Sequence, residues 1–311
     1  MLVVSDIKKS FDQKEVVRGV SFSVEKGESF GLLGPNGAGK STTISMICGL
    51  LTYDSGEVTV DGISVKKKPL DVKKKIGVVP QEIALYPTMS AKENLLFWGK
   101  MYGLSSKLAK KRVDEVLEYV GLRDRANDKI ETFSGGMKRR INIGASLMHE
   151  PELLIMDEPT VGIDPQSRNH ILETVKRLNQ NGMTVIYTSH YMEEVEFLCN
   201  RIGIVDQGKM IALGTKSDLV NRLAGGTVIK LSVASLKDEF TASLRKVTNV
   251  ERVIPDIENN SVDIFVHHHQ LAFSDIIACA MDNRVQVLSF EVQEPNLESL
   301  FLSLTGRTLR D

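Results

Sequence analysis

The sequence has little cysteine, no long apolar run and almost no excess of one charge. Its three cysteines, Cys48, Cys199 and Cys279, are scattered without a CxxC pair, which excludes a disulfide framework and favours a reducing compartment. We expect them to be buried small hydrophobic groups. No stretch of about 18 apolar residues occurs, and the N-terminal residues show no basic segment followed by an apolar run. The sequence therefore predicts no direct membrane insertion and no secretion signal.

The charge balance also limits the function. Lysine and arginine total 39, aspartate and glutamate total 40, and the net charge is −1. Such a chain has no overall attraction for nucleic acid or for an anionic membrane, so we expect no nucleic-acid partner. A length of 311 residues predicts two domains, at least one with a substantial core.

The most informative stretch, residues 34–41, matches the P-loop pattern G-x-x-x-x-G-K-S/T. It follows residues 28–33, which are typical of a short buried strand. Its glycines let the backbone turn tightly and point N–H groups inward, and the following helix adds its positive dipole end. In this anion cradle Lys40 would reach the β- and γ-phosphates and Ser41 would bind Mg²⁺. The predicted nucleotide-binding residues here are Gly34, Pro35, Asn36, Gly37, Ala38, Gly39, Lys40, Ser41 and Thr42.

The alternative for this stretch is a glycine-rich turn that binds no nucleotide. A strand and a helix both lie where the P-loop needs them, which favours the nucleotide.

Two further strand ends carry candidate catalytic groups. Residues 153–156 are typical of a buried parallel strand, and Asp157 and Glu158 follow it directly. Open α/β sheets bind ligands at this end of their strands. Asp157 would therefore hold magnesium, directly or through water, and Glu158 would accept a proton from the attacking water or orient that water. His190 ends the next predicted strand, where its imidazole could reach a terminal phosphate. Alone, these would be ordinary strand-end residues, but the P-loop upstream favours catalysis.

A helical segment separates the P-loop from these strands. Ser90 and Glu93 form a capping-box pattern that predicts a helix ending near Gly103, and a second helix is expected over residues 107–120. Further on, Ser134 is a natural N-cap for another helix. The next two residues, Gly135 and Gly136, would weaken that helix by roughly 0.5 to 1 kcal/mol each relative to alanine. A phosphate approaching the bare backbone would offset this loss, although a capped loop is equally compatible with these residues alone.

Taken in order, the motifs resemble those of the ATP-binding subunits of ATP-binding-cassette (ABC) transporters, over roughly residues 1–220. The resemblance implies an α/β P-loop NTPase fold with a mixed sheet, a helical subdomain at about residues 84–150, and ATP and Mg²⁺ as cofactors. Phenylalanine at 133 and methionine at 137 depart from the usual leucine and glutamine of the family's signature, but they leave its serine and N–H donors intact. The matching positions are Phe11, residues 34–41, Gln81, residues 133–137, residues 153–158, Asp164 and His190.

The resemblance also implies roles. Phe11 would stack on adenine, and Gln81 would act at the metal and γ-phosphate site and link it to a transmembrane partner. Ser134, Gly135 and Gly136 would close on the ATP of an opposite subunit. Asp164 would contact that subunit, and His190 would contact the γ-phosphate.

The function that follows is an ATPase working as a homodimer or with a paired ATPase subunit. ATP would join the subunits head to tail, and hydrolysis would part them. The resemblance implies an integral membrane permease as partner and a place at the cytoplasmic face of the cell membrane. Alternatives are a soluble ABC-type ATPase acting on nucleic acid or ribosomes, and a P-loop kinase or plain nucleotide-binding module. Tandem cassettes and long insertions, typical of the first, are lacking, and kinases lack the second serine-glycine-glycine element.

Residues 227–311 are expected to form a small α+β accessory or regulatory domain after a linker at residues 221–226. The predicted βαββαβ order is the ferredoxin-like split motif. His267, His268 and His269 would point in alternating directions along a strand end, which disfavours a shared metal. The tail, residues 294–307, resembles ATPase subunits of ABC-2 drug and antibiotic exporters, with the linearmycin-resistance type among them. The predicted elements are strands 227–233, 249–257, 261–267 and 285–293 and helices 235–246, 271–282 and 296–306.

Overall fold

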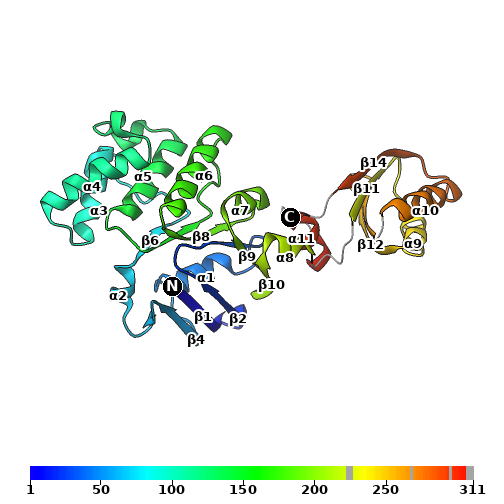
Figure 1. The fold of residues 1–311 in the computed structure, drawn as a ribbon, viewed down its shortest axis with the longest axis horizontal. Coiled ribbons are helices and arrows are strands. Elements are labelled where there is room, and N and C mark those ends of the chain that lie inside the picture. The colour runs from blue at the N-terminus through cyan, green and yellow to red at the C-terminus, as the bar shows by residue number, and fades with distance from the viewer. Residues whose placement is uncertain (222–226, 267–268, 294–295, 306–311) are drawn as a thin grey trace. The chain divides into compact units, whose positions relative to one another are not determined.

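The computed structural model describes residues 1–221, 227–266, 269–293 and 296–305. Within it the chain divides into two compact units, whose elements are labelled in Figure 1. The division falls between Leu213 and Gly214. Helix α8 (Lys216–Asn221) lies in the second unit, although the expected boundary at residue 220 assigns most of it to the first domain. Among the described residues, no helix is both long and apolar enough to cross a membrane.

The first unit contains a four-stranded antiparallel sheet of order β2-β1-β4-β5. Strands β1 and β2 are 10 and 11 residues long. Their pairing shifts register in places, and one of these shifts lies at Asp6, whose φ is 44°. Such bulges bend a strand without ending it. The strands are β1 (Leu2–Phe11), β2 (Lys14–Val24), β4 (Ser55–Val60) and β5 (Ile63–Ser64).

The second sheet of this unit has six strands in the order β10-β9-β3-β8-β7-β6. The pairs β3–β9, β3–β8, β7–β8 and β6–β7 are parallel. All residues of β3 and β8 are buried, as expected for strands covered on both faces. Because these strands are parallel, their carboxyl ends lie along one edge of the sheet. The strands are β3 (Ser29–Leu33), β6 (Ile76–Val79), β7 (Leu153–Asp157), β8 (Thr184–Ser189), β9 (Arg201–Asp206) and β10 (Lys209–Thr215).

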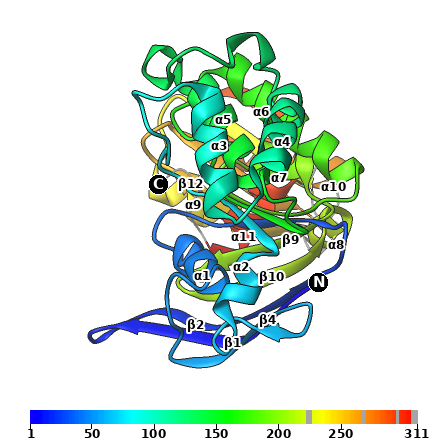
Figure 2. The same ribbon diagram turned by 90° about the vertical axis from the view of Figure 1, so that its left-hand side faces the viewer.

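Helices of the first unit lie around and beside these sheets. Figure 2 shows α3, α4 and α5 gathered at one end and β1, β2 and β4 at the other. The predicted capping box on α3 is present: the Glu93 amide donates to Ser90 Oγ at 3.2 Å, and the Ser90 amide donates to Glu93 Oε2 at 2.8 Å. The helices are α1 (Lys40–Ile47), α2 (Pro69–Lys73), α3 (Ala91–Met101), α4 (Ser106–Tyr119), α5 (Gly135–Leu147), α6 (Pro165–Gln180) and α7 (Met192–Leu198), with short 3₁₀ turns at Arg123–Arg125 and Ile130–Thr132.

One hydrophobic core joins both sheets of the first unit. Phe22 of β2 stacks on Phe30 of β3, with ring centroids 4.9 Å apart. Cys48 and Cys199 are buried as small apolar groups, as predicted, and Cys279 is partly buried. Burial raises the pKa of Cys48 and of Cys199 from 9.0 to about 12, so both remain thiols at neutral pH.

The second unit contains a four-stranded sheet of order β12-β13-β11-β14 in which every pair is antiparallel. Ile229, Leu231, Phe240 and Ile264 belong to its core. Helix α11 contacts α8 within the unit. The elements are β11 (Thr227–Val233), α9 (Asp238–Leu244), β12 (Val250–Asp256), β13 (Ser261–Val266), α10 (His269–Asp282), β14 (Val287–Gln293) and α11 (Leu297–Thr305).

The element order of this unit follows the prediction, with differences at the ends. Helix α9 begins at Asp238 rather than at residue 235, and α10 begins at His269 rather than at residue 271. His269 is therefore helical. His267, His268 and most of the predicted linker, residues 222–226, lie outside the described residues.

Candidate nucleotide-binding and catalytic site

The P-loop lies between β3 and α1, as predicted. Gly37 and Gly39 have φ values of 78° and 101°, a conformation that only glycine adopts without strain. A Cβ on Gly34 would lie 2.2 Å from the carbonyl oxygen of Val205, so the backbone also needs glycine there. The loop opens on a cavity of about 180 Å³. Its lining residues are Val16, Asn36, Gly37, Gly39, Lys40, Ser41, Thr42, Gln81 and Glu158.

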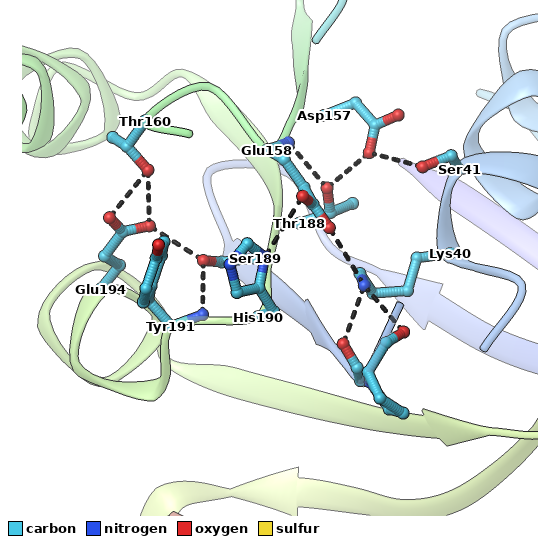
Figure 3. Close-up of polar contacts among 12 residues, drawn as sticks. Lys40, Ser41, Asp157, Glu158, Thr160, Thr188, Ser189, His190, Tyr191 and Glu194 are labelled. Atoms are coloured by element: carbon cyan, nitrogen blue, oxygen red, sulfur yellow. Dashed lines mark hydrogen bonds and ion pairs between the residues drawn. The ribbon is translucent and has the colours of Figure 1, made fainter. Parts of the chain in front are cut away.

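Lys40 is buried beneath this loop. Its ammonium donates to the carbonyl oxygens of Gly34 at 2.7 Å and Pro35 at 3.2 Å, and it lies 3.1 Å from Glu158 Oε1 (Figure 3). Lys40 and Glu158 are only 4% and 6% exposed. Two buried charges at this distance compensate one another, and loss of either would leave the other uncompensated.

Asp157 and Ser41 form the candidate magnesium site. Ser41 Oγ lies 3.3 Å from Asp157 Oδ1, and Thr188 Oγ1 donates to the same carboxylate oxygen at 2.6 Å. Hydroxyl and carboxylate oxygens are ligands that Mg²⁺ prefers. The described residues contain no cluster of three or more histidine, cysteine or acidic side chains able to hold a metal. The pair therefore suits an ion that takes its remaining ligands from phosphate and water, which is how proteins usually bind Mg²⁺.

Glu158 and His190 meet beside Lys40. His190 Nδ1 lies 3.2 Å from Glu158 Oε2, so one carboxylate contacts the P-loop lysine and the histidine. The Glu158 backbone has a φ of 45°. Its amide donates a hydrogen bond to Thr188 Oγ1 at 2.9 Å. A left-handed conformation in a non-glycine residue is uncommon and often occurs at functional sites. The segments that follow β7 and β8 thus bring the carboxylate of Glu158 and the imidazole of His190 to the lysine of the P-loop.

Gln81 lines the same cavity. Arg139, which was not predicted from the sequence, binds the backbone around Gln81. Arg139 of α5 donates to the carbonyl oxygen of Pro80 at 2.7 Å and also to that of Gln81. Arg139 is 4% exposed, and burial lowers the pKa of its guanidinium. A single arginine on a helix carries no sequence signal for this contact.

The other predicted nucleotide-binding residues lie outside the cavity that Lys40 lines. Phe11 ends β1 and is 45% exposed, with the Lys9 ammonium 5.6 Å from its ring centroid. Ser134 caps α5 by accepting from the Met137 amide at 3.2 Å, and Asp164 caps α6 by accepting from the Ser167 amide. The site residues therefore form two groups.

The glycine pair of α5 has an explanation that the sequence did not reveal. A Cβ on Gly136 would lie 2.1 Å from Ser167 Oγ, whereas a Cβ on Gly135 would meet only Ile163 at an ordinary 3.8 Å. Close packing against α6 therefore gives Gly136 a structural reason within this chain, and the approach of a phosphate to that position stays a prediction. Gly135 is exposed, and no close contact among the described residues requires glycine there.

Comparison with known proteins decides the family. A family model described as ABC transporter matches residues 17–161. Over 311 residues the chain is 65% identical to the linearmycin resistance ATP-binding protein LnrL of Bacillus subtilis (strain 168), and the match covers 100% of both chains. The chain belongs to the ABC transporter ATP-binding proteins.

Other relatives of this ABC protein agree. It is 37% identical over 308 residues to the Nod factor export ATP-binding protein I of Paraburkholderia xenovorans (strain LB400), which covers 98% of this chain and 97% of that one. A solved ATP-binding subunit of an ABC transporter superposes with a TM-score of 0.65 at 30% identity, covering 71% of this chain and 92% of the other. A dimeric post-hydrolysis cassette bound to ADP and phosphate superposes with a TM-score of 0.63 at 27% identity, over 69% and 98%. The protein is the ATP-hydrolysing subunit of a transporter.

Proposed function

We propose that this ABC ATPase binds ATP and Mg²⁺ at the P-loop and that Glu158 accepts the proton of the attacking water. Ser41 and Asp157 would hold the metal, and His190 would contact the γ-phosphate. Gln81 would act at the metal and the γ-phosphate and link this site to the transmembrane partner. The observation that carries this proposal is the Lys40–Glu158–His190 arrangement, in which side chains from three segments meet at distances of 3.1 and 3.2 Å. Bound phosphates would draw the lysine away from Glu158, leaving the carboxylate free to orient water.

We infer that ATP joins two subunits head to tail. Ser134, Gly135 and Asp164 are exposed and lie outside the cavity of Lys40, so a second copy could offer them to the nucleotide. The exposed Phe11 would stack on adenine. The dimeric cassette with ADP and phosphate, to which the chain is similar, supports this arrangement. Hydrolysis would remove the γ-phosphate that bridges the halves.

We further propose that the dimer drives an integral membrane permease at the cytoplasmic face of the membrane and that the cargo is an antibiotic. Full-length 65% identity to a linearmycin resistance ATP-binding protein supports a cargo of the linearmycin-like polyene type. Relatives named for Nod factor export support export as the direction. The near-zero net charge disfavours the alternative of an ATPase acting on nucleic acid.

We propose that residues 1–220 form the ATP-binding domain, with its helical subdomain at about 84–150, and that residues 227–311 form a ferredoxin-like accessory domain. The antiparallel order β12-β13-β11-β14 and the βαββαβ succession support the latter. Such a domain would regulate or dimerise the ATPase.

The catalytic proposal is tested with Glu158→Gln and Lys40→Ala. Glu158→Gln keeps the shape but loses the base, so we expect ATP hydrolysis to fall by about a hundredfold or more and the protein to elute as a dimer with ATP and Mg²⁺. Lys40→Ala should abolish nucleotide binding in calorimetry. Glu173→Gln, an exposed acid on α6, is the matched control and should behave as wild type. A folded Glu158→Gln that stays monomeric with ATP and Mg²⁺ would refute the head-to-tail mechanism.

The cargo proposal is tested in cells. A strain lacking this gene should become sensitive to linearmycin, and the wild-type gene but not Lys40→Ala should restore growth. Unchanged sensitivity in the deletion strain would exclude the proposed cargo without touching the ATPase mechanism.

A further inference from the structure

A second buried acid lies next to the site and takes no part in it directly. Glu194 is on α7, four residues after His190 in the sequence, and it is 2% exposed. A carboxylate this deeply buried is stable only if its oxygens accept hydrogen bonds. Its partners therefore show what the residue organises.

Three hydroxyl groups donate to Glu194. Thr160 Oγ1 lies 2.7 and 2.9 Å from its two oxygens, and Ser189 donates to Oε2 at 2.9 Å (Figure 3). The Tyr187 hydroxyl also donates to Oε2 at 2.9 Å. Arg168 of α6 adds an ion pair, with Nε 3.5 Å from Oε1. Burial and the charge of Glu194 raise the pKa of Tyr187 well above its ordinary value, so the tyrosine stays a donor.

These donors come from the two segments that carry the proposed catalytic groups. Thr160 is two residues after Glu158, and Ser189 immediately precedes His190. Ser189 Oγ also accepts from the Tyr191 amide at 2.9 Å, so the backbone on both sides of His190 is fixed through one hydroxyl. Glu194 thus links the segment after β7 to the end of β8, directly before His190.

Arg168 of α6 contacts Tyr191 as well as Glu194. The Arg168 guanidinium lies 4.8 Å from the centroid of the Tyr191 ring, and α6 begins directly after its capping residue Asp164. A displacement of the start of α6 would therefore reach both Glu194 and the residue that follows His190.

We propose that Glu194 is a positioning residue for ATP hydrolysis that holds the His190 imidazole against Glu158. It touches neither group and acts only through the hydroxyls of Thr160 and Ser189. The inference rests on the proposed role of His190. Without the carboxylate, the two segments would part and the 3.2 Å contact between His190 and Glu158 would lengthen.

The first test is Glu194→Gln, measured on the full chain by steady-state ATP hydrolysis. Glutamine has one oxygen in place of two and an amide that donates, so the three hydroxyls cannot keep their bonds. We expect kcat to fall by about tenfold to a hundredfold, as for other small misplacements of catalytic groups, with KM for ATP within about twofold of wild type because the P-loop is untouched. Glu193→Gln, an exposed acid beside it on α7, should leave both constants unchanged.

The second test asks whether the effect passes through His190. In a His190→Ala background, Glu194→Gln should lower kcat by less than about twofold further, since the contact that it maintains is already gone. A full, multiplicative loss in that background would show a merely structural role and would overturn the inference. If His190→Ala alone leaves hydrolysis unchanged, the proposed role of His190 fails, whereas wild-type kcat in a folded Glu194→Gln overturns only the present inference.

A third variant covers the case in which Glu194→Gln does not fold, as judged by thermal unfolding. The double variant Thr160→Val, Ser189→Ala removes two donors and keeps the acid, and it should reproduce the loss of kcat at constant KM. A rise in KM at constant kcat in this variant would contradict the proposal.

Discussion

Single side chains at the site interact mainly with residues distant in the sequence. Ser41 reaches Asp157 across 116 residues, and the Glu158 amide reaches Thr188. The P-loop and the acids after β7 could be predicted because each is a local pattern beside a recognisable strand. Arg139, Thr188 and Glu194 could not, because each is a single polar residue in an ordinary helix or strand and its partners appear only on folding.

The glycine pair of α5 gives a prediction with a built-in control. Gly136→Ala would push a methyl group into Ser167, and such overpacking should destabilise the protein by about 1 to 3 kcal/mol. The methyl group of Gly135→Ala would meet only Ile163, at an ordinary contact distance of 3.8 Å, so this variant should be neutral or stabilise the helix by up to about 1 kcal/mol. Urea unfolding of both variants measures the difference.

In the proposed head-to-tail dimer the methyl group of Gly135→Ala would face the nucleotide of the partner, so this variant should reduce ATP-dependent dimerisation of the Glu158→Gln protein. Equal stability of the two alanine variants would contradict the packing explanation for Gly136.

The thiols give a prediction about reactivity and pH. Because the pKa values of Cys48 and Cys199 rise from 9.0 to about 12 on folding, and only the thiolate reacts, iodoacetamide at about pH 8 should alkylate both far more slowly in the native protein than in urea. Each folded pKa lies above the unfolded value, so their stabilising effect is complete below pH 9.0 and is lost as the pH rises toward 12. Mass spectrometry of the alkylated peptides gives the rates, and rapid native labelling of Cys48 would show that its burial is wrong.

Helices and strands with a clear periodic pattern were predictable at the level of elements. Helix α4 differs from its expected range by one residue at each end. Helices α2 and α7, with 5 and 7 residues, are too short to show a helical period, and sequence analysis missed both.

The capping box of α3 leads to a prediction about local opening. Ser90→Ala removes the acceptor of the Glu93 amide and should lower the opening free energy of α3 by about 1 kcal/mol, the usual effect of losing such a cap. Hydrogen exchange of α3 amides measures it. Ser105→Ala at the start of α4, where the hydroxyl accepts from the Leu108 amide without a returning carboxylate, should have a smaller effect.

The effect of Ser90→Ala also depends on pH. Hydrogen bonds from the Ser90 amide and hydroxyl lower the pKa of Glu93 from 4.5, so the stabilisation is present above that value and is lost as the pH falls through the lowered pKa. Equal exchange rates in wild type and Ser90→Ala at neutral pH would contradict the assigned cap.

At the scale of the molecule, the two units should respond differently to nucleotide. Each has its own hydrophobic core, and the site residues all lie in the first. We expect calorimetry to resolve two unfolding transitions. ATP with Mg²⁺ should stabilise only the first unit, raising its free energy of unfolding by about 2.7 kcal/mol at a hundredfold excess over Kd. Lys40→Ala should remove this shift. One transition that moves as a whole would show instead that the units unfold together.

Strand β3 is synthesised early and acquires its neighbours late. Its hydrogen-bonding partners are β8 and β9, both of which follow the P-loop by more than a hundred residues in the sequence. A nascent chain that has emerged only through α1 therefore lacks the two strands that pair with β3 and hold the phosphate loop after it. Cellular ATP can stabilise the polypeptide only after β8 has left the exit tunnel, so prematurely terminated products would gain no protection from nucleotide and would remain open to proteases.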